Sequence, residues 1–106
     1  MPKRMRMSNP QSRFFMALAC DQRIKILELL RHKEMCSCEL VPALEIDQSV
    51  VSRHLSLLRE VGMIEGHKQG VNIYYTIADK RILQILDLSK EMLRDLFEKQ
   101  QQFFSV

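Results

Sequence analysis

The sequence predicts a mostly α-helical domain with one small β-hairpin, and two observations carry this expectation. Apolar residues recur at helical spacing through most of the 106 residues, whereas two short β-rich runs occur only between residues 63 and 77. The composition is typical of a folded chain, with 46% hydrophobic residues, three Gly and three Pro. A chain of this length has room for one hydrophobic core, which predicts a single domain.

Three helices are expected in the first half of the chain. The segment PQSRFFMALA begins at Pro10, and Pro is well tolerated in the first turn of a helix. Residues 21–32, DQRIKILELLRH, place apolar side chains on one stripe and charges opposite, as an amphipathic helix does. Residues 37–44, SCELVPAL, predict a short helix with Ser37 as its cap, which is irregular unless Pro42 lies in its first turns.

A further helix and the hairpin follow. Residues 49–62, SVVSRHLSLLREVG, have an apolar and a polar face, and Gly62 is a typical helix stop. Residues 63–65 and 72–77 are rich in β-forming side chains, and the segment GHKQGV between them predicts a polar, mildly basic hairpin tip.

The last expected helix, from Asp79 to about Gln102, carries more apolar surface than one domain core can cover. Because an uncovered apolar face favours a partner, the sequence predicts a homodimer. The apolar side chains, which occupy more than one narrow stripe, are Ile82, Ile85, Leu86, Leu88, Met92, Leu93, Leu96 and Phe97.

Charge and cysteine content limit the function classes. The net charge is +3, but residues 1–13 hold four basic side chains and no acid, so we expect a flexible basic arm at residues 1–9 and a domain at residues 10–106. The basic excess is therefore weak evidence for nucleic acid. No run approaches the roughly 20 apolar residues that cross a membrane. We expect a cytoplasmic protein without a membrane partner, whose three cysteines stay reduced.

The order helix, short turn, helix, hairpin is typical of a winged helix-turn-helix. The second of these helices has the polar side chains that a groove-facing helix needs, with small hydroxyls at Ser49, Ser52 and Ser56 and longer donors at Gln48 and Arg53. The simpler interpretation is a solvated helix face, because polar residues cover such faces in any protein. The pattern alone leaves DNA binding and a plain exposed face both open.

A longer stretch carries a family resemblance. Over roughly residues 10–100 the chain resembles the ArsR/SmtB family of metal-responsive winged-helix repressors. The most specific pieces are QSVVSRHLSLLREVGMIE, which resembles the recognition helix and first wing strand, and CSCEL, which resembles a Cys-x-Cys-Asp/Glu-Leu metal motif. The resemblance implies a homodimer paired through the first and last helices, which represses its own operon until a metal or metalloid releases it from operator DNA.

The resemblance also implies residues that contact DNA. Lys68 and Gln69 become candidates at the wing tip. His54 has a second interpretation, because it lies on the inward edge of its helix and suits a packed, hydrogen-bonded role nearly as well. The major-groove candidates on the recognition helix are Gln48, Ser49, Ser52, Arg53 and His54.

Cys36 and Cys38 are the candidate effector ligands. On a finished helix, side chains two residues apart point about 200° away from each other, so the pair shares one ligand only where the backbone is extended or is entering a helix. Thiolates prefer soft ions, namely As(III), Sb(III), Cd(II), Pb(II), Hg(II) or Cu(I). An ion held by both sulfurs is expected to distort the start of the 37–44 helix and to shift the recognition helix.

The ligand patterns of the family put arsenite or antimonite first among these effectors. Arsenic sensors of the family commonly carry a third cysteine shortly after the pair; this chain has none there, so Cys20 or an outside thiol is the candidate third ligand. Cadmium and lead sensors add cysteines on the N-terminal arm, which has none here. Zinc-type members place Asp-x-His and His-x-x-Glu or His on the last helix, but after Asp79 the expected nitrogen ligands are replaced by Arg81, Met92 and Asp95.

Two alternatives stay open. A thiol-based redox sensor of the same fold would oxidise Cys36, Cys38 or Cys20; because a disulfide between cysteines one residue apart is strained, we expect a sulfenic acid or an intersubunit bridge instead. A protein-interaction module that uses the fold without DNA is the other alternative. We expect no enzyme, since the sequence has no glycine-rich phosphate loop, no zinc-hydrolase spacing and no cysteine with a convincing histidine partner.

Overall fold

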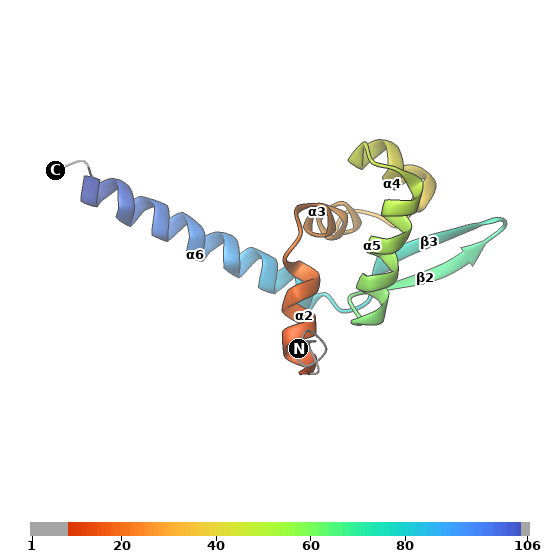
Figure 1. Cartoon of the computed structure of the whole chain (residues 1–106), viewed down its shortest axis with the longest axis horizontal. Coiled ribbons are helices and arrows are strands. Elements are labelled where there is room, and N and C mark those ends of the chain that lie inside the picture. Colours follow the sequence, from red (N-terminus) through yellow and green to blue (C-terminus); the bar gives the residue numbers. More distant parts are fainter. Residues whose placement is uncertain (1–8, 105–106) are drawn as a thin grey trace, which may run out of the picture.

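The computed structural model describes residues 9–104, with side chains described as far as residue 101. The predicted arm lies outside this part, except for Asn9, whose side-chain oxygen caps the first helix. Within the described residues the chain forms five helices and one antiparallel sheet, which confirms the mostly α-helical class (Figure 1). The elements in order are α2 (Pro10–Leu18), α3 (Asp21–Leu30), β1 (Met35–Cys36), α4 (Ser37–Leu44), α5 (Gln48–Glu60), β2 (Ile64–Gln69), β3 (Asn72–Ile77) and α6 (Arg81–Phe104).

The core lies where α3, α4 and α5 meet. Each of these helices contributes apolar side chains from the stripe that its sequence predicts, and the burial of one such side chain stabilises the fold by about 1.5–3 kcal/mol. A turn of three residues joins α4 to α5, which gives the helix-turn-helix. The side chains at the centre of the core, with no exposed surface, are Ile26, Leu27, Leu40, Val51 and Leu58.

The sheet has the strand order β1-β3-β2, which is one strand more than the sequence predicts. In the added strand, Met35 pairs with Tyr75 and Cys36 pairs with Tyr74. A strand of two residues is too short for the alternation that reveals strands in a sequence, so the prediction of an isolated hairpin was incomplete. The pairing attaches the segment that carries the cysteines to the hairpin.

The hairpin is also more regular than predicted. β2 includes GHKQ, which the sequence suggests as part of a loop, because every residue of β2 pairs with β3, from Ile64 opposite Ile77 to Gln69 opposite Asn72. The ladder outweighs the weak β-propensity of these side chains. The turn is reduced to two residues, of which Gly70 has a φ of +65°, in the left-handed region that suits glycine.

α6 leaves the domain after its first two turns (Figure 1). Ile82 and Leu86 are buried, whereas the apolar side chains from Leu88 to Phe97 are exposed by half or more. Phe15 and Met16 of α2 are exposed to the same degree. None of the described helices is long and apolar enough to cross a membrane. The exposed apolar side chains of α6 are Leu88, Met92, Leu93, Leu96 and Phe97.

Ion pairs hold the start of α6 against α3. Arg31, the residue that caps the end of α3, donates to Glu28 of α3 at 2.8 Å and to Asp87 of α6 at 2.7 Å, and Lys90 of α6 reaches Glu28 at 2.9 Å. The hydrogen bonds from Arg31 and then Lys90 lower the pKa of Glu28. Because these side chains are partly exposed, the pairs contribute more to the direction of α6 than to the stability of the domain.

Candidate DNA interface and thiol site

The recognition helix α5 presents a polar face to solvent and an apolar face to the core. Val51, Leu55 and Leu58 are buried, at no more than 2% exposure. Arg59 in the last turn suits the negative end of the helix dipole. The predicted groove-facing side chains, apart from His54, are all exposed, as the prediction requires: Gln48, Ser49, Ser52 and Arg53.

His54 differs from its neighbours on α5, because both ring nitrogens have partners inside the protein. Its Nε2 lies 2.8 Å from Oε1 of Gln22, and its Nδ1 lies 3.2 Å from Nη1 of Arg23. Arg23 also donates to the carbonyl oxygens of Ala17 at 2.7 Å and Met16 at 3.2 Å, at the end of α2. Since an amide oxygen only accepts and a guanidinium only donates, the imidazole is the neutral tautomer with its proton on Nε2.

The electrostatic surroundings keep His54 neutral. Burial is the largest cause that lowers its pKa, followed by the positive charges of Arg23 and Arg53. A half-buried, neutral ring with both nitrogens engaged connects α2, α3 and α5 and is poorly placed to contact a phosphate. The geometry favours the packed interpretation of His54.

The wing residues Lys68 and Gln69 are exposed, but they lie on the last two positions of β2 rather than on a loop tip. The tip itself is Gly70 and Val71, of which Val71 is 94% exposed. Successive side chains of a strand point to opposite faces. Lys68 and Gln69 therefore point to opposite faces of the wing. A DNA duplex that lies against one face of the wing would meet only one of the two side chains.

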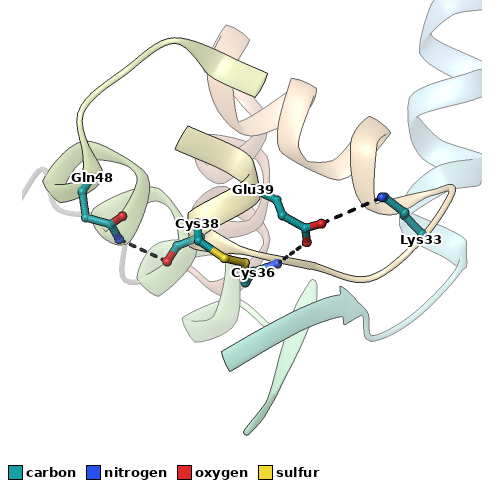
Figure 2. Close-up of a disulfide and its surroundings, with 6 residues drawn as sticks. Lys33, Cys36, Cys38, Glu39 and Gln48 are labelled. Atoms are coloured by element: carbon teal, nitrogen blue, oxygen red, sulfur yellow. Dashed lines mark hydrogen bonds and ion pairs between the residues drawn. A yellow bond between two sulfur atoms is a disulfide. The ribbon is translucent and has the colours of Figure 1, made fainter. Parts of the chain in front are cut away.

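The two cysteines meet where β1 passes into α4. Cys36 has an extended backbone, with φ −88° and ψ 166°, and Cys38 is the second residue of the helix. Their Cα atoms are 5.1 Å apart and their sulfurs are joined as a disulfide (Figure 2). The predicted condition for a shared ligand, an extended backbone entering a helix, is met. The expectation that the pair would not bond to itself was wrong, because the change of backbone conformation between the two residues turns both side chains to one side.

The neighbours of the pair stabilise the extended side more firmly than the helical side. Glu39 accepts a hydrogen bond from the backbone N–H of Cys36 at 3.1 Å, and its other oxygen lies 3.9 Å from Nζ of Lys33 (Figure 2). On the helical side, Pro42 lies inside α4, not confined to its first turn. Proline has no N–H, so the carbonyl of Cys38, four residues earlier, lacks its helical donor. The start of α4 is therefore its weakest part.

The two thiol positions differ in access. Cys36 is 2% exposed, whereas Cys38 is exposed at the surface. Cys20 is half-buried at the opposite end of α3, whose ten residues span about 15 Å. Among the described residues, no group of three or more His, Cys, Asp and Glu side chains is arranged to hold a metal. The structure thus brings Cys36 and Cys38 together but does not bring Cys20 to them.

The start of α6 does not fit a zinc site. The carboxylate of Asp79 is 2.7 Å from Nη2 of Arg81, and the hydrogen bonds from Arg81 lower the pKa of Asp79 to about 2. An arginine in the position of a nitrogen ligand occupies the carboxylate and repels a cation. The residues present at this position fit an ion pair, so we assign no metal to it.

Comparison with known proteins agrees with this geometry. Residues 20–65 match the family model described as bacterial regulatory protein, arsR family. The arsenic resistance transcriptional regulator ArsR1 of Pseudomonas putida is 36% identical, over 74% of this chain and 68% of that protein. The chain belongs to the ArsR/SmtB family.

Two further relatives in the ArsR/SmtB family are named as regulators other than an arsenic regulator. A transcriptional repressor SmtB homolog of Synechocystis is 33% identical, over 68% of this chain and 54% of that protein. The cadmium resistance regulatory protein CadC of Listeria innocua is 33% identical, over 73% of this chain and 66% of that protein. The chain therefore spans between about half and two thirds of the length of these two relatives.

Solved structures confirm the winged helix-turn-helix fold. The crystal structure of Rv0081 from Mycobacterium tuberculosis has a TM-score of 0.79 and 28% identity, over 85% of this chain and 91% of that chain. The homodimeric winged helix-turn-helix DNA-binding domain of Mb0332 from Mycobacterium bovis has a TM-score of 0.74 and 26% identity, over 81% of this chain and 80% of that chain.

For this member of the ArsR/SmtB family, sequence reasoning missed the residues that connect the site to its surroundings. Gln22 and Arg23 look like ordinary solvated side chains of an amphipathic helix, and their contacts with His54 join positions 31 or 32 residues apart. Ser37 was expected as a cap; it is instead the first helical residue, and Cys36 occupies the cap position. No spacing rule reveals these contacts, because tertiary packing creates them.

Proposed function

We propose that the chain is a homodimeric, DNA-binding transcriptional repressor of the cytoplasm that leaves its operator when Cys36 and Cys38 bind arsenite or antimonite. The observation that carries this proposal is the position of the two sulfurs, which face each other at the entrance of α4, the helix that leads directly into α5 (Figure 2). A ligand that joins these sulfurs acts on the backbone that holds the recognition helix.

The exposed face of α5 supports the DNA part of the proposal. Gln48, Ser49, Ser52 and Arg53 supply hydrogen-bond donors and acceptors of a length that reaches base edges and phosphates. Lys68 or Gln69 of the wing adds a contact beside them. The exposed apolar side chains of α2 and α6 support a homodimer, and pairing presents two recognition helices to a two-fold symmetric operator. The homodimeric Mb0332 domain has the same fold.

The chemistry of the pair suits a trivalent arsenic or antimony hydroxide. Each thiol forms one bond from its sulfur to arsenic and displaces one hydroxide, which takes the thiol proton and leaves as water. Two thiols therefore release two waters, and the third oxygen stays on arsenic or is replaced by an outside thiol. Exposed Cys38 reacts first and Cys36 closes the ring. The resulting distortion of α4 weakens operator binding, and a coupling of about 1–3 kcal/mol corresponds to roughly 5- to 150-fold.

The bond between Cys36 and Cys38 supports a second candidate, a repressor that senses hydroperoxides. The Cys38 thiolate attacks the peroxide O–O bond and becomes a sulfenic acid, and one water leaves after proton transfer. The Cys36 thiol then displaces the second oxygen as water and forms the disulfide. The two thiols lose two electrons and hydrogen peroxide gains them.

Single cysteine variants separate these functions. We expect reduced wild-type protein to bind a fragment of its own promoter and to lose roughly 5- to 150-fold in affinity with arsenite, measured by fluorescence anisotropy. Cys36→Ser and Cys38→Ser should bind DNA like the wild type and lose the response, because one thiol cannot close a ring. Cys20→Ser is the matched control and should respond normally.

Each part of the proposed function has an experimental outcome that would contradict it. Release by peroxide without release by arsenite would replace the metalloid function by the redox function. Release by cadmium or Hg(II), but by neither arsenite nor peroxide, would identify a different soft ion. A full arsenite response in both Cys36→Ser and Cys38→Ser would show that the pair is not the sensor. An absence of salt-dependent binding to promoter DNA would remove the repressor function itself.

A further inference from the structure

We infer that Ser37 is the positioning residue that transmits the state of the thiol pair to Gln48, a base-reading side chain of the recognition helix; this inference rests on the proposed function. Ser37 lies between Cys36 and Cys38 in the chain, and Gln48 is the first residue of α5. Nε2 of Gln48 donates to Oγ of Ser37 at 3.1 Å, a contact drawn in Figure 2.

The contact fixes how Gln48 presents its amide. Nε2 also lies 3.3 Å from Oγ of Ser52, so the two N–H groups of the amide are directed at two serine hydroxyls of the protein. The carbonyl oxygen is then the group that the amide offers to DNA. In the major groove an acceptor of this kind reads the exocyclic amine of adenine or cytosine. With its nitrogen held, Gln48 does not make the two-point contact with adenine that a free glutamine makes.

The state of the two sulfurs controls the position of the Ser37 hydroxyl. Open thiols, sulfurs bridged by one ion and a direct disulfide require three different separations of the two side chains. The backbone torsions of residues 36–38 set this separation, and Ser37 is the residue in the middle. A change in the sulfurs therefore rotates or displaces Oγ of Ser37.

The surroundings place this motion on the α4 side of the pair, because the β1 side is held and the α4 side is not. Cys36 is fixed on its own side by the ladder with Tyr74 and by the hydrogen bond from its N–H to Glu39. Cys38 is on the yielding side, because Pro42 leaves its carbonyl without a helical donor. The contact between Ser37 and Gln48 is exposed, so it can break and re-form with little loss of packing.

The experiment compares four proteins with and without arsenite: wild type, Ser37→Ala, Ser37→Thr and Ser56→Ala. Alanine is accepted at the first position of a helix, so Ser37→Ala removes the hydroxyl and keeps α4. Threonine restores a hydroxyl at the same place. Ser56 is an exposed serine two turns farther along α5 and serves as the matched control. The measurements are operator affinity by anisotropy, free thiols after arsenite by thiol titration, and the thermal unfolding midpoint.

We expect arsenite to consume two thiols in all four proteins, since the pair itself is unchanged. The ratio of operator affinities without and with arsenite should fall from roughly 5–150 in the wild type to below about 2 in Ser37→Ala, and should stay at the wild-type value in Ser37→Thr and Ser56→Ala. Ser37→Ala and Gln48→Ala together should lower affinity less than the sum of the single changes, because both remove the same contact.

The outcomes separate this inference from the proposed function. A wild-type ratio in Ser37→Ala would overturn the role of Ser37 and leave the arsenite function intact. Loss of the ratio in Ser37→Thr as well as Ser37→Ala, with unfolding midpoints unchanged, would also overturn it, since the restored hydroxyl would have no effect. A wild-type protein whose thiols are consumed while its operator affinity stays constant would overturn the proposed function and the inference together.

Discussion

The helices α5 and α6 are both strongly amphipathic, yet only α5 buries its apolar face within the domain. In α5 the apolar side chains Val51, Leu55 and Leu58 are buried. In α6 the apolar side chains from Leu88 to Phe97 are exposed by half or more. The comparison teaches that periodicity identifies a face and leaves open what covers it. α5 buries its apolar side and offers its polar side, whereas α6 leaves its apolar side chains from Leu88 to Phe97 uncovered, which is the surface that the proposed homodimer would use.

The largest expected effect comes from charge on the exposed face of α6. Leu93→Glu with Phe97→Glu should dissociate the homodimer, because four carboxylates would meet in the interface. Two linked recognition helices bind about 10²- to 10⁴-fold more tightly than one, so operator affinity should fall by about 10²-fold or more. Sedimentation measures the oligomeric state and anisotropy measures the affinity. A variant that stays dimeric would show that α6 is not the element that pairs.

A matched pair of leucine truncations tests the same contrast more directly. Leu55→Ala of α5 removes side-chain volume from the core and should lower the free energy of unfolding by about 3 kcal/mol. Leu96→Ala of α6, made in the dissociated background, should change it by less than about 0.5 kcal/mol, because the side chain is exposed there. Urea unfolding followed by circular dichroism measures both. Equal losses would mean that α6 folds back on its own domain.

The smallest expected effect is on the pH dependence of the unfolding free energy, through the hydrogen bonds that His54 of α5 makes with Gln22 and Arg23 of α3. The pKa of His54 is lower in the folded protein than its ordinary value of 6.5, first because of burial and then because of the charges of Arg23 and Arg53. The unfolded chain therefore binds the proton more readily, so the contribution of His54 is present above pH 6.5 and is lost as the pH falls through the lower, folded pKa.

His54→Gln is the matched variant for this effect, because an amide keeps hydrogen bonds to Gln22 and Arg23 without titrating. Unfolding free energies of wild type and variant, measured across the range below pH 6.5, should show a steeper loss in the wild type. Parallel curves would mean that folding does not lower the pKa of His54, and that its ring is not held neutral by burial and by Arg23.

Local patterns were enough to predict the recognition helix, its stop at Gly62 and the exposure of Gln48 and Arg53. A helix face and a glycine stop depend only on residues that are close together in the sequence. Local patterns were not enough for β1, whose only evidence is its pairing with Tyr74 and Tyr75. The ladder with β3 also overrode the loop expected around Lys68. In each case a contact between distant parts of the chain decided the outcome.

The candidate site shows the same division. The spacing and type of Cys36 and Cys38 predicted a pair of soft-ion ligands, and the structure brings the two sulfurs together while their ligand stays a prediction. The hydrogen bond from Gln48 to Ser37 and the ring contacts of His54 depend on how α4 and α3 pack against α5, which no spacing reveals. The sequence therefore predicted candidate reacting groups, but not the residues that connect them to the recognition helix.

The unequal exposure of the two cysteines implies a filter on which molecules act on the protein. A reagent that makes a single bond and carries no further leaving group, such as a bulky alkylating electrophile, stops at the surface sulfur of Cys38 and leaves Cys36 untouched beneath it. Only a small species with at least two bonds to exchange closes the ring. The valence and size of a molecule, more than its affinity for sulfur, would then decide whether it acts as an effector of this protein.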